Sequence, residues 1–256
     1  MNNLLDDYAL ISPLRYRNNK LKLGIAIFGL LAGVSSTSVA TPLFVAFCMG
    51  ITTVFFGKVP LKFYFQLMLA PMGFAIAGTV VILFFFGSGS EVFSFNVFGY
   101  RLVANAQGVD MALHVISRTV SGMSCMFFLS LSTPVVELFS VLKSIRVPDV
   151  VIELSMLIYR YIFVFLEVAM SIKYAQTVRL GYKDFKTSLS SVAMLASTLF
   201  ISSWEQGEKL YVSMSSRCYD GKLAMFEARR PIRLPEAIIA GVYVISTIAC
   251  SYLSIT

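Results

Sequence analysis

Long stretches of this 256-residue chain contain no charged side chain at all. The charge-free stretches are residues 23–57, 63–90 and 237–256. A helix needs about 20 apolar residues to cross a bilayer, so the first stretch holds two crossings and each of the others holds one. Residues 110–133 form a further candidate crossing, although His114 and Arg118 lie within it. We therefore expect an all-α integral membrane protein with about five transmembrane helices.

Residues that carry catalytic or metal chemistry are also scarce. The chain has one histidine, His114, and a single imidazole cannot form a metal site by itself. The four cysteines share neither a metal-ligand nor a disulfide spacing; they are Cys48, Cys125, Cys218 and Cys250. The sequence contains neither a Gly-x-Ser-x-Gly nucleophile elbow nor a Gly-x-x-x-x-Gly-Lys-Ser/Thr phosphate-binding loop. We therefore expect no directly bound metal or cofactor, and any ATP-derived energy must come from another chain.

The net charge of +7 is distributed in a way that indicates the orientation in the membrane. Positive residues gather before the first crossing and between the second and third; they are Arg15, Arg17, Lys20, Lys22, Lys58 and Lys62. The turn near residues 35–42 carries no charge, and Arg101 is the only cation in the loop from 87 to 110. The positive-inside rule then places the N-terminus and residues 134–235 in the cytoplasm. It explains the basic excess without a nucleic-acid partner.

Charges of both signs concentrate between the fourth and fifth crossings. Thr133-Pro134 predicts a helix start there, because Thr is a good N-cap and Pro suits the first helical position. We expect three helices: one reaching about residue 145, one from 148 to about 180, and one from 187 or 188 to about 219. The predicted domains are membrane helices 1–133, cytoplasmic helices 134–234 and a last membrane helix 235–256.

The back halves of the two longer cytoplasmic helices resemble each other. Glu167 precedes Arg179 by twelve residues, and Glu205 precedes Arg217 by the same interval. Each interval also contains a lysine and a tyrosine, and a glycine follows each arginine; these residues are Lys173, Tyr174 and Gly181, and Lys209, Tyr211 and Gly221. We expect the glycines to adopt the left-handed conformation that commonly ends a helix. Chance similarity between two amphipathic helices is the competing explanation.

An arginine at the C-terminal end of a helix is favoured, because that end is partly negative. The planar guanidinium also offers a fork of donors to carboxylate or carbonyl groups. Two such tips could enter two grooves on a soluble partner. They could equally be solvated helix caps or contacts to lipid headgroups, and the residues alone leave both interpretations open.

The order of these features resembles the transmembrane coupling component of energy-coupling factor transporters, in its cobalt-type CbiQ form. The resemblance covers nearly the whole chain and is carried by residues 57–62, 132–134, 147–149, 159–162, 175–182 and 216–222. The last two segments match the family's paired small-Arg-Gly motifs in position. Here the motifs read Val178-Arg179-Leu180, followed by Gly181, and Ser216-Arg217-Cys218, with Gly221 three residues later. Both arginines are kept, but neither is directly followed by glycine.

The resemblance implies a scaffold in a prokaryotic plasma membrane that joins two cytoplasmic ABC-type ATPase subunits to a substrate-binding membrane subunit. The ATPase-coupling residues would be Val178, Arg179, Leu180, Gly181, Ser216, Arg217, Cys218 and Gly221. ATP would be used by the partner subunits, and this chain would not be an enzyme. The implied cargo is a transition-metal ion, cobalt or nickel.

Other classes are open to test. A vitamin-type form of the same component would share these features. A stand-alone secondary transporter should carry charged residues in several crossings and inverted repeats, whereas only the predicted fourth crossing carries charge here. A membrane enzyme would need a catalytic set that the chain lacks. We expect Arg118 to pair within the helix bundle or to reach a polar edge.

Overall fold

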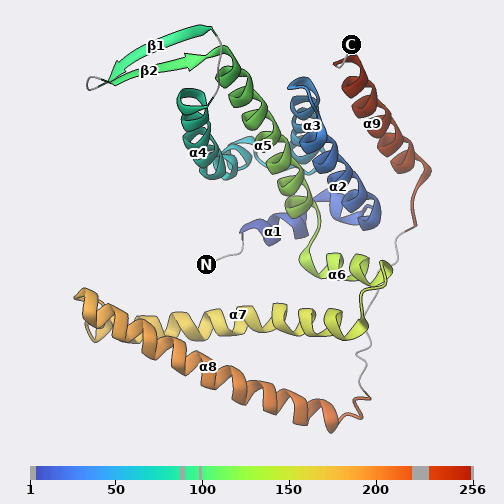
Figure 1. Cartoon of the computed structure of the whole chain (residues 1–256). Helices are drawn as coiled ribbons and strands as arrows, with labels where there is room; N and C mark the ends of the chain where they lie inside the picture. Colours follow the sequence, from blue (N-terminus) through green and yellow to red (C-terminus); the bar gives the residue numbers. More distant parts are fainter. Residues whose placement is uncertain (1–3, 87–89, 98–99, 221–230, 255–256) are drawn as a thin grey trace. The chain divides into compact units, whose positions relative to one another are not determined.

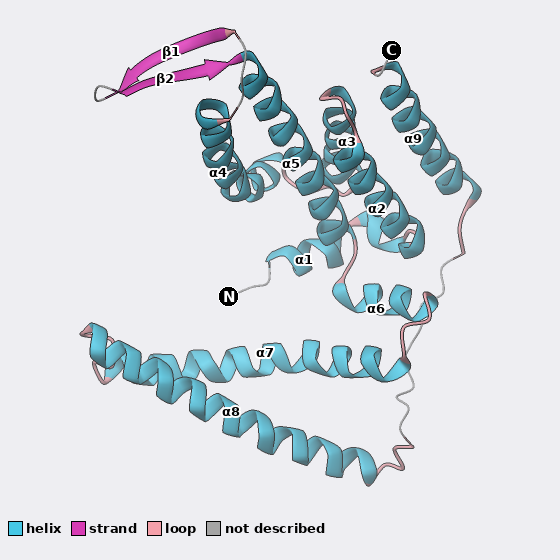
Figure 2. Cartoon of the chain, viewed as in Figure 1, coloured by secondary structure: helices cyan, strands magenta, loops and turns pink. Residues whose placement is uncertain are grey.

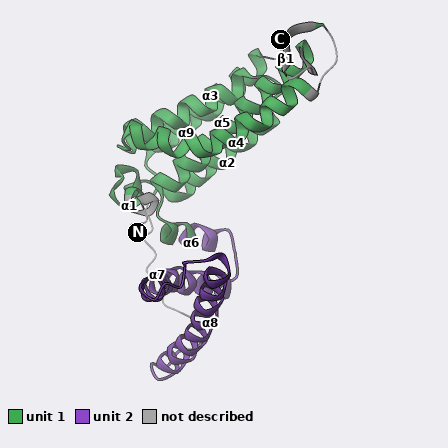
Figure 3. Cartoon of the chain, turned by 90° about the vertical axis from the view of Figure 1, so that its left-hand side faces the viewer, with its two compact units in different colours: residues 1–138, 228–256 green, residues 139–227 purple. Residues whose placement is uncertain are grey.

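The computed structural model describes residues 4–86, 90–97, 100–220 and 231–254. Most of these residues are helical, and the predicted all-α membrane fold is confirmed (Figures 1 and 2). The chain divides into two compact units, one of residues 1–138 with 228–256 and the other of residues 139–227 (Figure 3). We call them unit 1 and unit 2.

Unit 1 contains the helices that occupy the five predicted crossings. Its elements are α1 (Leu4–Ile11), the 3₁₀ turn η1 (Pro13–Tyr16), α2 (Asn19–Ser35), α3 (Ala40–Ile51) with its π-helical continuation η2 (Thr52–Phe56), α4 (Leu61–Phe85), α5 (Ala106–Ser132) and α9 (Leu234–Leu253). Helix α5 packs against α1, α2, α3 and α4 and is the central helix of the unit. The serines and glycines at these contacts are small, which lets membrane helices approach closely. A Cβ atom at Gly33, for example, would collide with Ser121 of α5.

Four helices in the described ranges are long and apolar enough to span a membrane: α4 over Leu61–Phe84, α5, α8 (Phe185–Ser215) and α9. Helix α2 has 17 residues, about 26 Å, and is therefore shorter than a typical hydrocarbon core. Helix α3 with η2 forms another short apolar helix, Ala40–Phe56. Helix α8 is apolar enough to belong to this group because its first half carries no charge between residues 187 and 204. Its predicted place in the cytoplasm stays a prediction.

A β-hairpin between α4 and α5 was not expected from the sequence. Strands β1 (Glu91–Val97) and β2 (Tyr100–Asn105) are antiparallel, with Val97 opposite Tyr100. Strand β1 is rich in β-branched and aromatic residues, a composition that favours strands, and β2 contributes Tyr100 and Val103. The hairpin adds a local feature to the helical fold, in a region that the sequence analysis treated only as a loop.

Unit 2 is built on a pair of long helices. The first cytoplasmic helix expected from the sequence is α6 (Val135–Ser144), and the boundary between the units falls within it. Helices α7 (Asp149–Val178) and α8 contact each other, meet at the turn formed by residues 179–184 and diverge from there (Figure 1). Helix α8 begins two or three residues earlier than predicted. None of its residues is buried, so an extended surface is left open.

Candidate functional site

The first predicted arginine lies at the end of α7. Arg179 is the C-cap residue, and Leu180 after it has a left-handed backbone with φ of 59°. The Leu180 N–H donates to the Thr177 carbonyl at 3.0 Å, and the Gly181 N–H donates to the Gln176 carbonyl at 2.8 Å. This pair of bonds is a Schellman motif, which satisfies carbonyls left open at a helix end.

The second arginine has the same backbone arrangement at the end of α8. Cys218, directly after Arg217, also has φ of 59°. The Cys218 N–H donates to the Ser215 carbonyl at 3.1 Å, and the Tyr219 N–H donates to the Met214 carbonyl at 3.1 Å. Counted from the arginine, donors and acceptors therefore occupy the same positions in both motifs.

The prediction that Gly181 would adopt the left-handed conformation is wrong. That conformation belongs to Leu180, and in the second motif to Cys218, whereas Gly221 lies outside the described residues. Gly181 is needed for a different reason: a Cβ atom there would lie 2.7 Å from Ser191 Oγ and 2.9 Å from the Gln176 carbonyl oxygen. The left-handed position is the one where the small-Arg-Gly pattern has its glycine, which gives that pattern a backbone explanation.

Both guanidinium groups are available to a partner. Arg179 and Arg217 are exposed, and neither side chain has a hydrogen bond or ion pair among the residues that the structure describes. Val178 is 84% and Leu180 68% exposed, so the first arginine lies between two open apolar side chains. The second arginine lies between Ser216, whose hydroxyl donates to the Val212 carbonyl at 2.9 Å, and the exposed thiol of Cys218. Each tip therefore presents a cation on an ordered helix end.

The first tip is held by three side-chain hydrogen bonds across the α7–α8 turn. Gln176 Nε2 donates to the Ser191 carbonyl at 2.9 Å, and Tyr182 donates its hydroxyl to Gln176 Oε1 at 2.7 Å. Ser191 Oγ donates to the Gly181 carbonyl at 2.7 Å. These bonds fix the turn that carries Arg179 to the first turns of α8. Sequence reasoning missed Gln176, Tyr182 and Ser191, because their contacts cross a turn whose geometry is not a local pattern.

The second tip is bonded to the beginning of α7. Tyr219 donates its hydroxyl to Glu153 Oε2 at 3.3 Å, and Glu153 is only 6% exposed. Burial and the nearby carboxylate of Glu153 raise the pKa of Tyr219, so the phenol stays protonated and remains a donor. The two tips therefore share a backbone motif but have different supports.

The two arginines lie at opposite ends of α8. Arg179 precedes the helix and Arg217 follows it, and α8 has 31 residues. At about 1.5 Å per residue, roughly 46 Å separates its two ends. A single small ligand cannot span that distance, so the arrangement is suited to two sites or to a large partner.

A model of a known family matches most of this chain. The family model CbiQ, described as cobalt transport protein, matches residues 12–227, a range of this chain that contains both arginine motifs. The chain belongs to the CbiQ family. A CbiQ-family chain is a component of cobalt transport, and its four long apolar helices are those of a membrane protein.

Three relatives are similar to this CbiQ-type chain to different extents. An uncharacterized protein of Methanocaldococcus jannaschii is 39% identical over 252 residues, which cover 98% of this chain and 94% of that protein. A protein of Methanocorpusculum labreanum named as a fused cobalt transport protein CbiMQ is 43% identical over 88% of this chain and 38% of its own length. The cobalt transport protein CbiQ of Salmonella typhimurium is 28% identical over 60% of this chain and 69% of its own.

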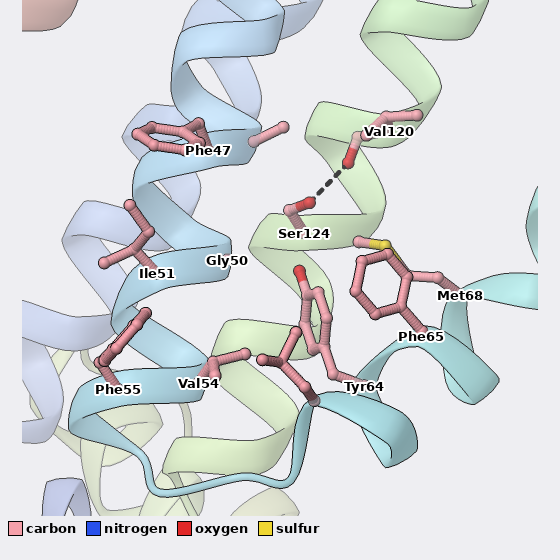
Figure 4. Close-up of a pocket in the computed structure, with 12 residues that line it drawn as sticks. Phe47, Gly50, Ile51, Val54, Phe55, Tyr64, Phe65, Met68, Val120 and Ser124 are labelled. Atoms are coloured by element: carbon pink, nitrogen blue, oxygen red, sulfur yellow. Dashed lines mark hydrogen bonds between the residues drawn. The ribbon is translucent and has the colours of Figure 1, made fainter.

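Two of the cavities among the described membrane helices of this CbiQ-type chain contain polar side chains. One, of about 410 Å³, lies between α3, α4 and α5, where Tyr64 points toward Ser124 between apolar side chains (Figure 4). The other, of about 600 Å³, is lined by His114 and Arg118. As expected, Arg118 bonds within the bundle: its Nη2 donates to the Ser36 carbonyl at 2.7 Å. Within the described ranges, no group of three or more His, Cys, Asp or Glu residues is arranged to hold a metal ion.

Proposed function

We propose that this CbiQ-family chain is the transmembrane coupling component of an energy-coupling factor transporter. It would link two cytoplasmic ATPase subunits to a substrate-binding membrane subunit for cobalt uptake. The observation that carries the proposal is the pair of matching arginine tips at the two ends of α8, about 46 Å apart. Two tips with the same backbone motif are suited to two copies of one kind of partner.

The tips have the chemistry of a docking contact. Each arginine is exposed at a helix end whose backbone is already ordered, so binding requires little further ordering of the main chain. A guanidinium can form bidentate hydrogen bonds with a carboxylate or a pair of carbonyls in a groove. Closure of two ATPase subunits on ATP would change the distance or angle between their grooves. Because α7 and α8 are fastened at the first tip, that change would move the helix pair.

The membrane partner is proposed from a relative and from the surface of unit 2. One relative is named as a CbiMQ fusion, which supports a CbiM-like subunit as the neighbour of this chain. Helices α7 and α8 also leave large apolar side chains open, including Ile158, Leu166, Leu189 and Phe200, which are 52–70% exposed. Large exposed apolar patches mark sites of interaction with proteins or membranes. We assign this surface to the substrate-binding subunit.

The proposal includes an orientation and a cargo. The N-terminus and residues 134–234 would face the cytoplasm, and ATP would be hydrolysed by the partner subunits. Cobalt is favoured because the family description names it, and nickel is the alternative of similar chemistry.

Copurification tests the proposal directly. The chain is coexpressed with candidate ATPase subunits and a CbiM-like membrane subunit and purified through a tag on the chain alone. We expect an ATP-hydrolysing complex that accumulates Co²⁺ in vesicles, and no ATP hydrolysis by the chain without its partners. Sustained ATP hydrolysis by the isolated chain, or Co²⁺ uptake by vesicles that contain only this chain, would overturn the proposal.

A further inference from the structure

The basic N-terminal segment of unit 1 is bonded to two helices of unit 1, α6 and α9, which are next to the junctions with unit 2 in the sequence. The chain leaves unit 1 after residue 138 and returns to it at residue 228. Helix α6 begins just before the first junction, and α9 is the first described helix after the second junction. We refer to residues 12–22, which reach both helices, as the N-terminal clamp.

The clamp is anchored in the membrane helices. Ser12 is 2% exposed, and its hydroxyl donates to the Gly57 carbonyl, in the turn between η2 and α4, at 3.2 Å. Lys22 is 3% exposed, and its Nζ donates to the Ser132 carbonyl at 2.9 Å and to the Leu14 carbonyl at 3.1 Å. Ser132 is the last residue of α5, where a cation is favoured by the helix dipole. The clamp is therefore fixed to the end of the central helix.

On the outgoing side, the clamp holds the first turn of α6. Glu137 is the third residue of that helix, and its side chain is 14% exposed. Arg15 Nε donates to Glu137 Oε1 at 3.2 Å, and Asn19 Nδ2 donates to Glu137 Oε2 at 2.7 Å. Both carboxylate oxygens are thus bonded to the clamp. Such charged, partly buried hydrogen bonds are stronger than neutral ones.

On the returning side, the clamp holds the first turn of α9 in the same way. Glu236 is the third residue of α9, and its side chain is 9% exposed. Arg17 Nη1 donates to Glu236 Oε1 at 2.7 Å. Two arginines that are two positions apart in the chain therefore each bind a glutamate in the first turn of a helix of unit 1.

We propose that the N-terminal clamp transmits movement from unit 2 to the membrane helices, with Arg15 and Arg17 as positioning residues. A displacement of unit 2 would reach unit 1 along the chain, and the helices next to the two junctions in the sequence, α6 and α9, have first turns that are bonded to the clamp. The clamp passes that displacement to the end of α5 through Lys22 and to the η2–α4 turn through Ser12. This inference rests on the proposed coupling function.

The test uses the complete transporter in vesicles with the double variant Arg15→Ala, Arg17→Ala. We measure Co²⁺ taken up per ATP hydrolysed and, separately, the ATPase subunits retained on the chain. Loss of charged hydrogen bonds predicts about a tenfold fall in uptake per ATP, with ATPase retention unchanged. The matched control is Lys20→Ala, because Lys20 is an exposed cation of the same segment with no ion pair in the described structure. The Lys20→Ala transporter should take up as much Co²⁺ per ATP as the parent transporter.

A charge exchange separates transmission from stability. Arg15→Glu should reduce uptake per ATP, and the added Glu137→Arg should restore it, because the link is rebuilt with reversed polarity. If the double alanine variant takes up as much Co²⁺ per ATP as a working parent transporter, the clamp proposal is overturned and the proposed function is not. The clamp is also overturned if thermal stability, ATPase retention and uptake fall in parallel. If the parent chain retains no ATPase subunits, both the proposed function and the clamp proposal are overturned.

Discussion

Three arginines of unit 1 and two arginines of unit 2 differ in whether their side chains have partners. In unit 1, Arg15 and Arg17 each bind a glutamate that is largely buried, and Arg118 binds a backbone carbonyl. In unit 2, Arg179 and Arg217 are exposed and have no partner among the described residues. The first group fastens the fold internally, whereas the second contributes little to folding. Substitutions in the two groups should therefore fail in different assays.

The largest expected effect comes from removing both exposed arginines. Arg179→Ala with Arg217→Ala should abolish ATPase copurification, while the melting temperature of the isolated chain stays within error of the parent. Each charged contact is worth about 1.5–3 kcal/mol, roughly a tenfold to hundredfold loss in affinity per site. The double loss should exceed either single loss greatly, because the second contact is effectively intramolecular. Lys183→Ala is the control, since Lys183 is a neighbouring exposed cation. Normal assembly of the double variant would remove the distinction between the two groups.

A lysine at these positions sharpens the comparison between charge and shape. Arg179→Lys and Arg217→Lys keep the charge but lose the planar fork of donors. We expect about a tenfold loss of ATPase affinity per site, measured by titration of the purified subunits. Full recovery with lysine would show that bulk charge suffices and would favour the lipid-headgroup explanation.

The next effect concerns the support of the first tip. Gly181→Ala should lower the stability of the α7–α8 turn by about 1–3 kcal/mol, because the added methyl meets Ser191 and the Gln176 carbonyl. Faster amide exchange of residues 176–191 would report it. The control is Gly207→Ala in α8, where a Cβ atom meets nothing within 4 Å. That change should be neutral or stabilising, and equal exchange in both variants would contradict the role given to Gly181.

The smallest expected effect is a gain. Leu180→Gly and Cys218→Gly place glycine at φ of 59°, where other residues are strained. Each should raise the melting temperature of the isolated chain slightly, corresponding to at most about 1 kcal/mol. Val178→Gly, at the last residue of α7, should instead be destabilising by roughly 0.5–1 kcal/mol. A loss of stability in both left-handed variants would contradict the Schellman geometry.

Much of the helical layout could be predicted from the sequence, because absence of charge over about 20 residues is a local property that hydropathy reports directly. The ends of α7 and α8 were marked by their arginines. The left-handed residue was assigned to Gly181 because glycine is the commonest choice, and the actual position is set by the last hydrogen bonds of the helix. The hairpin was overlooked, although its strand pattern was present between residues 91 and 105.

The clamp could not be predicted in this way. Arg15 and Glu137 are separated by 122 residues, and Arg17 and Glu236 by 219, so no local pattern links them. The positive-inside rule already explained the basic residues before the first crossing. Their charge therefore gave no reason to look for bonding partners. The fold shows that the same residues serve a second purpose, since three of them form bonds to helix ends.

Cys218 gives the second tip a chemical property that the first tip lacks. Its thiol is exposed directly after Arg217, whereas Leu180 holds the equivalent place after Arg179. The other cysteines lie in α3, α5 and α9, and none of them is fully exposed. A polar thiol-reactive fluorophore should therefore label one end of α8 selectively in the unmodified chain. Its emission would follow occupancy of that end alone, which makes two nearly equivalent contacts optically distinguishable.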